Sequence, residues 1–108
     1  MNLEKLREAK PTLRWKTSQY PYSEEVISQC EIALEEFIRN LDTLGDPLKS
    51  QDILRCVQAV VVKFNKLDAI YSFIETVERE DLCDFIYIAA RMAGLDTDED
   101  ITEKWRDW

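Results

Sequence analysis

Residues 23–44 read SEEVISQCEIALEEFIRNLDTL, and their apolar side chains recur every three or four positions. This spacing places the apolar side chains on one face of an α-helix and most charged ones on the opposite face. Ser23 is a preferred N-cap residue, and Glu24 and Glu25 follow in the first turn, where the helix dipole favours negative charge. Gly45 and the Asp-Pro pair after it are typical of a helix end and a turn. We therefore expect one long amphipathic helix here.

Two further stretches have the same period. Residues 50–70 carry apolar residues at helical spacing after Ser50, a candidate N-cap, and residues 76–93 do so before Gly94, a typical C-terminal stop. A connector of residues 71–76 separates them. Long amphipathic helices with short links pack side by side in opposite directions. The sequence therefore predicts an all-α fold: an antiparallel bundle of three long helices with short terminal helices, in a single domain of 108 residues.

The two ends of the chain differ from this core of residues 23–94. Residues 1–22 form a basic arm in which we expect a short helix over residues 2–9, ended by Pro11, and then irregular structure. Residues 95–108 are predicted as an acidic loop followed by a short C-terminal helix. These pieces are too short to be stable alone, so we expect them to pack on the core.

Composition excludes several classes of function. The 108 residues include 14 Lys and Arg, 22 Asp and Glu, and no histidine, for a net charge of −8. Without histidine there is no His-based general base, nucleophilic pair or metal ligand. The acidic balance argues against nucleic acid and anionic membranes as partners, since both attract basic surfaces. No residue pattern indicates a cofactor, and the chain is predicted not to be an enzyme.

Three cysteines, at positions 30, 56 and 83, form no C-x-x-C motif and have no zinc-site spacing. Each falls on the apolar side of a predicted helix, so we interpret them as small core residues rather than reactive thiols. Residues 1–10 carry five charges and no apolar run, and no stretch is apolar enough to span a membrane. Together with the odd cysteine count, this predicts a cytoplasmic protein with reduced thiols.

Charge is distributed unevenly along the chain. Residues 1–22 have a net charge of +3, residues 23–70 of −4 and residues 71–108 of −7. The basic arm is expected to lie across the acidic body, with a role in a partner site as the alternative. The aromatic residues near both termini are likewise expected to cover the open core, with an interface role as the alternative.

Two acidic clusters lie in the most negative part of the chain. Residues 96–100 read DTDED and superficially match a calcium-binding loop, but Ile101 stands where that loop needs glycine, so a helix start with solvated charge is preferred. The other cluster begins the helix of residues 76–93 and contains the pair Glu80 and Asp84, which repel each other at i, i+4. An ordinary solvated helix face is the simpler interpretation, and a negative binding surface is the alternative.

Four stretches resemble a set of small uncharacterised acidic bacterial proteins of helical fold. They are YPYSEEV (residues 20–26), EREDLCDFI (78–86), AARMAGL (89–95) and DITEKWRDW (100–108). Some proteins of this style are similar to immunity proteins that neutralise a toxin. The resemblance implies a helical cytoplasmic protein and brings no catalytic residues with it.

The leading hypothesis is a non-enzymatic protein that binds a basic protein partner, such as a toxin, through its acidic surface. A self-associating homodimer is the first alternative, and a carboxylate- or metal-dependent enzyme is the second. The expected partner contacts are these: Glu75, Glu78, Asp81, Asp84, Asp98, Trp105 and Trp108.

Overall fold

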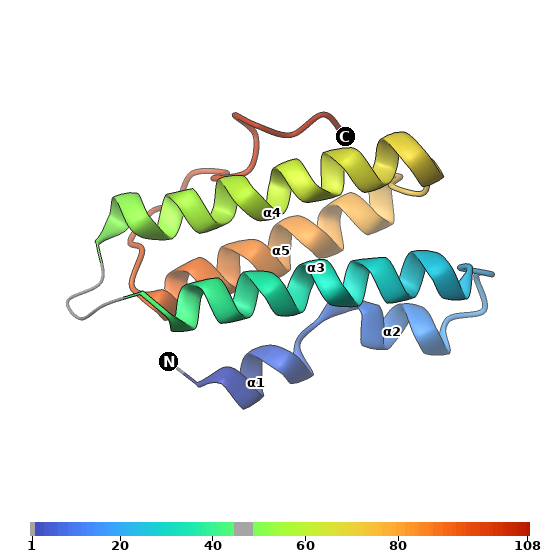
Figure 1. The fold of residues 1–108 in the computed structure, drawn as a ribbon, viewed down its shortest axis with the longest axis horizontal. Helices are drawn as coiled ribbons and strands as arrows, with labels where there is room; N and C mark the ends of the chain where they lie inside the picture. The colour runs from blue at the N-terminus through green and yellow to red at the C-terminus, as the bar shows by residue number, and fades with distance from the viewer. Residues whose placement is uncertain (1, 45–48) are drawn as a thin grey trace.

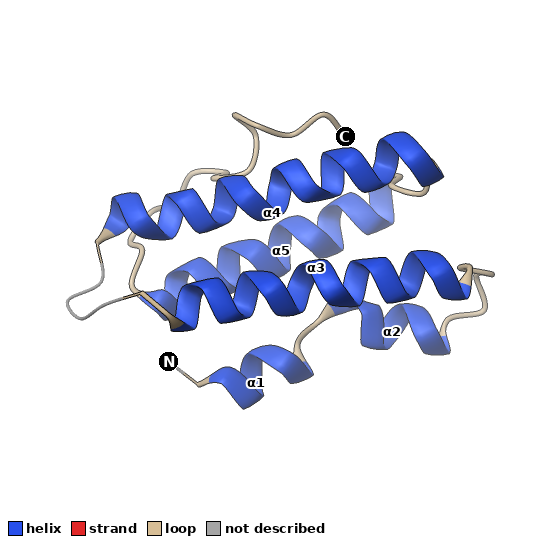
Figure 2. Ribbon diagram, in the orientation of Figure 1, coloured by secondary structure: helices blue, strands red, loops and turns tan. Residues whose placement is uncertain are grey.

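The protein is all-α in a computed structural model that describes residues 2–44 and 49–108 (Figures 1 and 2). These residues contain five helices and no strand, which confirms that the fold is all-α. The helices are α1 (Leu3–Glu8), α2 (Pro11–Thr17), α3 (Glu24–Asp42), α4 (Ser50–Tyr71) and α5 (Thr76–Ala93). The predicted stop at Gly45 and turn at residues 46–47 lie outside the described residues.

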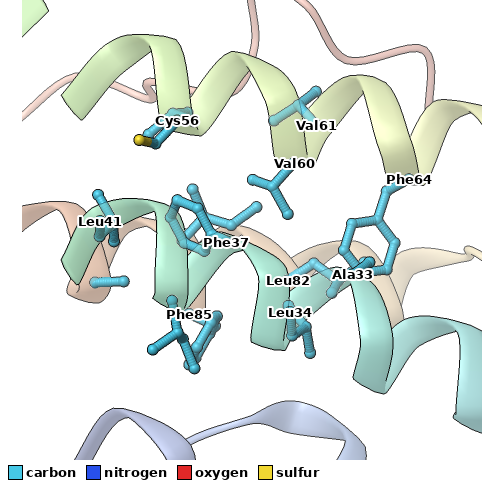
Figure 3. Packing of buried hydrophobic residues seen from close by; sticks show 14 of the residues in the cluster. Ala33, Leu34, Phe37, Leu41, Cys56, Val60, Val61, Phe64, Leu82 and Phe85 are labelled. Carbon is cyan, nitrogen blue, oxygen red and sulfur yellow. The ribbon is translucent and has the colours of Figure 1, made fainter. Parts of the chain in front are cut away.

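Helices α3, α4 and α5 contain 19, 22 and 18 residues and enclose the core. The chain reverses direction between α3 and α4 and again between α4 and α5 (Figure 1). Between α3 and α4, Phe37 lies near Val60 and Ala33 near Phe64, and Phe85 contributes from α5 (Figure 3). The rings of Phe37 and Phe85 meet edge to face with centroids 6.4 Å apart. Burial of such side chains is the main stabilising contribution to the fold.

The ends of the long helices follow from local hydrogen bonds. Ser23 Oγ accepts from the Val26 amide at 3.1 Å, which confirms it as the N-cap of α3. Helix α4 ends at Ser72 in the left-handed conformation, and Asp68 Oδ1 accepts from the next two amides at 3.1 and 2.9 Å. Gly94 closes α5 with φ +115°, a conformation that glycine adopts readily.

Two predictions for the chain ends are wrong. Residues 11–17 form helix α2 instead of irregular structure, because Pro11 occupies the first position of a helix, where its missing N–H costs nothing. Residues 101–105 form consecutive turns instead of a C-terminal helix. There, Asp100 and Asn65 bind the backbone groups of Thr102, Trp105 and Asp107.

Among residues 2–44 and 49–108, no helix combines the length and the apolar character that crossing a membrane requires. Burial also agrees with the interpretation of two cysteines: Cys30 and Cys56 are buried in the core, whereas Cys83 is half-buried. Burial raises the pKa of the Cys30 thiol to about 12, so this thiol stays protonated.

Candidate functional site

The basic arm lies across the acidic body, as predicted. Arg7 Nη2 is 2.8 Å from Glu35 Oε1, and Lys10 and Lys16 approach the carboxylate of Glu31 to 3.2 and 2.9 Å. Glu31 and Glu35 are neighbours at i, i+4 on α3 and would repel each other without these cations. The arm therefore neutralises the acidic face of α3.

Glu31 is the most heavily bonded of these carboxylates. Besides the two lysines, Thr12 Oγ1 donates to Glu31 Oε1 at 2.7 Å. Partial burial alone would raise the pKa of Glu31, but the hydrogen bonds from Thr12, Lys16 and Lys10 outweigh it and lower that pKa to about 2. The ionised form is thus strongly preferred in the folded state.

The lowered pKa of Glu31 predicts how the free energy of unfolding depends on pH. A carboxylate whose pKa is depressed on folding contributes stability above its unfolded pKa, near 4.5, which is lost as pH falls toward about 2. We expect the wild type to have a higher free energy of unfolding than Glu31→Gln. The difference should be constant above about pH 5.5 and should shrink as the pH falls from about 5 to about 2. Urea denaturation at each pH measures this difference. A difference that does not vary with pH would contradict the arrangement.

Two of the predicted partner contacts also hold the arm. Asp81 on α5 accepts from Trp15 Nε1 at 3.0 Å and lies 3.2 Å from Arg14 Nη2. Glu78 is only 6% exposed, and its carboxylate accepts from the Tyr22 hydroxyl at 2.5 Å. Burial raises the pKa of Tyr22, and the adjacent Glu78 carboxylate raises it further, so the phenol remains a donor. Glu78 and Asp81 therefore form intramolecular bonds with residues of the arm.

Glu75 precedes α5 as its N-cap residue. Its backbone N–H donates to Glu78 Oε1 at 3.0 Å, which is one half of a capping box. The Glu75 side chain is exposed at this end of the helix. In this cluster, Glu75 and Glu78 therefore cap the N-terminus of α5, and Glu78 and Asp81 hold the arm.

The C-terminal segment, residues 95–108, is held to the bundle by two polar side chains. Asn65 on α4 donates to the Trp105 carbonyl at 2.8 Å and accepts from the Asp107 N–H at 3.0 Å. Tyr87 on α5 donates to the Thr97 carbonyl at 2.7 Å. Trp105 and Trp108 are half-buried against the core, which confirms that these rings cover it.

Removing residues 106–108 is expected to lower the melting temperature by at least about 4–8 °C. In a domain of this size, that change corresponds to a loss of about 1 kcal/mol in the free energy of unfolding. The truncation removes the Trp108 ring and the Asp107 amide that bonds to Asn65. Circular dichroism on heating measures the change. Asp107→Ala is the matched control, since it keeps the backbone bond and should melt like wild type. An unchanged melting curve for the truncation would indicate that the terminal rings do not pack.

A groove runs between α5 and the C-terminal segment, and we call it the acidic groove. It comprises two adjoining hollows of about 350 and 320 Å³ that share Cys83, Asp84 and Asp100. Its complete lining is Arg79, Glu80, Cys83, Asp84, Tyr87, Asp98, Glu99, Asp100, Ile101 and Arg106. Five carboxylates against two arginines leave it with a formal charge of −3.

The carboxylates of the acidic groove are not equally available. Asp100 accepts from Thr102 N at 2.9 Å and Thr102 Oγ1 at 2.6 Å, and it pairs with Arg106 Nη2 at 3.2 Å. Asp84 and Asp98 are exposed, and across residues 2–44 and 49–108 neither forms an ion pair. Glu80 and Glu99 are exposed as well and form no ion pair among these residues, so the groove presents four negative side chains toward solvent.

Neither the thiol nor the carboxylates of the acidic groove form an arrangement typical of catalysis in the residues that the structure describes. Burial raises the pKa of the Cys83 thiol, and the hydrogen bond between Cys83 and Thr102 only partly opposes this, so Cys83 is not an activated nucleophile. Within the described ranges, no three Asp, Glu or Cys side chains converge in a way that would hold a metal ion. Asp96, Asp98 and Asp100 in particular do not form a ligand set, because Asp100 is bonded within its own turn.

Of the seven predicted contacts, the acidic groove unites Asp84 and Asp98, which are 14 positions apart in sequence. Trp105 lines a neighbouring hollow beside Lys104, and this hollow shares Glu99, Asp100 and Ile101 with the acidic groove. Tyr87 and Glu99, which also line the groove, were not among the predicted contacts. Two local signals pointed to this surface: the repulsion between Glu80 and Asp84, and the acidic run of residues 96–100.

The chain has no detectable relative among the proteins it was compared with. No protein-family model matches it, and neither a curated protein nor a solved structure shows significant similarity to it. Function must therefore be argued from the geometry above.

Proposed function

We propose that this chain is a non-enzymatic, cytoplasmic bacterial protein that binds a basic protein partner through the acidic groove. In this proposal α3, α4 and α5 act as an antiparallel bundle of three long helices that provides a rigid support for the groove. The mode of action would be that of an immunity protein, which masks a basic surface of a toxin by direct contact.

One observation carries the proposal: the cations of the arm neutralise some carboxylates, whereas other carboxylates are exposed beside one another in the acidic groove. The arm pairs with Glu31, Glu35 and Asp81, while Asp84 and Asp98 face solvent in one groove without an ion pair among the described residues. Clustered charge of one sign costs folding free energy and steers oppositely charged partners. A basic partner would relieve that repulsion.

The test begins with affinity capture from an extract of the organism that makes the protein, with the wild-type chain immobilised. Captured proteins are identified by mass spectrometry, produced in pure form, and titrated by calorimetry at 50 and 300 mM salt. We expect a partner of net positive charge whose affinity falls with salt, because added ions screen exposed charges. A partner whose affinity is independent of salt would refute binding by charge.

Self-association is a second candidate with an observation of its own. Ile70 at the end of α4 and Val77 at the start of α5 are 70% and 61% exposed on either side of the α4–α5 connector. Contiguous exposed apolar patches mark interaction sites, and these two side chains flank one short connector. Light scattering over a range of concentrations distinguishes a monomer from a dimer, and Ile70→Ser with Val77→Ser should abolish a dimer formed here.

A further inference from the structure

A second groove lies at the end of the molecule where α2 leads into α3, at the right of Figure 1. It has a volume of about 610 Å³ and we call it the aromatic groove. Its lining is Trp15, Lys16, Ser18, Tyr20, Tyr22, Glu24, Ile27, Ser28 and Glu31. None of these residues lines the acidic groove.

Three aromatic rings form one wall. The Trp15 and Tyr22 rings stack with centroids 5.3 Å apart and an interplanar angle of 21°. The Tyr20 ring follows, 4.6 Å from that of Tyr22. Trp15 is buried at 3% exposure, whereas Tyr20 is 56% exposed. The series of rings therefore begins in the core and ends in a tyrosine that is open to solvent.

The exposed tyrosine is held in place by its own loop. The Tyr20 N–H donates to Ser18 Oγ at 3.0 Å, and the Tyr22 N–H donates to the Tyr20 carbonyl at 2.9 Å. Pro21, between the two tyrosines, restricts the backbone further. Backbone that is already restricted at Tyr20 loses less conformational entropy when a ligand binds there.

The groove also contains a carboxylate without a cation. Lys16 and Glu31 pair with each other at 2.9 Å. Glu24, in the first turn of α3, is exposed, and in the part of the chain that the structure describes it forms no ion pair. The unbalanced charge of the aromatic groove is therefore negative, and the exposed Tyr20 ring lines the same groove.

We propose that the aromatic groove binds an arginine side chain of a partner protein, with the guanidinium over the Tyr20 ring and hydrogen-bonded to Glu24. An aromatic face attracts a cation, and a planar guanidinium can stack on a ring while it donates to a carboxylate. A lysine ammonium, which is compact and strongly hydrated, fits this pair of contacts less well. The site goes beyond the proposed function, since it stands whether or not the acidic groove binds a partner.

The test uses the full chain and a blocked Gly-Arg-Gly-Arg-Gly peptide, titrated while NMR follows the Tyr20 ring and the Glu24 amide. We expect saturable shifts at both positions. The matched peptides carry lysine, or the uncharged isostere citrulline, in place of arginine. The lysine peptide should bind more weakly and the citrulline peptide should not bind detectably.

Variants assign the contacts. Tyr20→Leu should weaken binding about fivefold, the upper range for an exposed cation–π contact, whereas Tyr20→Phe should retain it. Glu24→Gln should weaken binding and reduce its salt dependence. Asp84→Asn with Asp98→Asn, which alters only the acidic groove, should leave the affinity unchanged. The proposal is overturned if the arginine peptide shifts neither residue, if the lysine peptide binds equally well, or if Tyr20→Leu binds like wild type.

Discussion

Trp15→Ala is expected to lower the free energy of unfolding by about 3–5 kcal/mol, the usual cost of removing a large buried ring. Trp15 is 3% exposed, stacks on Tyr22 and meets the edge of Phe73 with centroids 6.3 Å apart. Its indole N–H also donates to Asp81. The substitution thus leaves a cavity and removes a hydrogen bond at the same point. Urea denaturation followed by circular dichroism measures the loss.

The control for this prediction is Leu13→Ala in the same helix. Leu13 is 41% exposed, so its truncation should change stability by no more than about 0.5 kcal/mol, as at most surface positions. Trp15→Phe should fall between the two, because it retains most of the apolar volume and loses the bond to Asp81. Equal stabilities for Trp15→Ala and Leu13→Ala would mean that the arm does not pack on the body in solution.

The second large effect concerns binding. Asp84→Lys with Asp98→Lys is expected to slow association with a basic partner by at least about tenfold at low salt, because it reverses the field that steers the encounter. Both side chains are exposed, so the fold should be unaffected. Stopped-flow mixing of the two purified proteins measures the association rate at several salt concentrations.

The matched control is Glu4→Lys with Glu8→Lys on α1. Both glutamates are exposed, and the change in net charge is identical. If position in the acidic groove matters, this control should reduce the rate much less than the groove variant. Equal reductions would show that only net charge matters and would remove the acidic groove from the proposed function.

Helices α3, α4 and α5 could be predicted from the sequence almost to the residue. Their apolar period is long and uninterrupted, and two predicted caps are local and correct: Ser23 accepts from an amide three residues away, and Gly94 adopts the left-handed conformation. Ser50, by contrast, is the first residue of α4 rather than its N-cap, which is Lys49. Pro11 was ambiguous because proline both ends one helix and begins another. Residues 101–105 failed to form the expected helix because their partners include Asn65, which is 40 positions from Trp105.

The candidate site was predictable only in part. Asp84 and Asp98 could be proposed from charge alone, but nothing local distinguished them from Glu78 and Asp81. The distinction arises because Tyr22 and Trp15, 56 and 66 positions away, donate to Glu78 and Asp81. Contacts over such separations depend on the path of the arm across the body.

Local sequence therefore specified that the chain forms amphipathic helices, where the three long ones lie and which of their faces is buried. Helical period and capping act within a few residues, so the sequence contains that information directly. Tertiary structure decided which carboxylates remain exposed, which aromatic rings are buried and where two grooves form. Those outcomes depend on pairing between distant segments. The net charge of −8 does not show which carboxylates stay exposed, because the arm pairs with some of them and not with others.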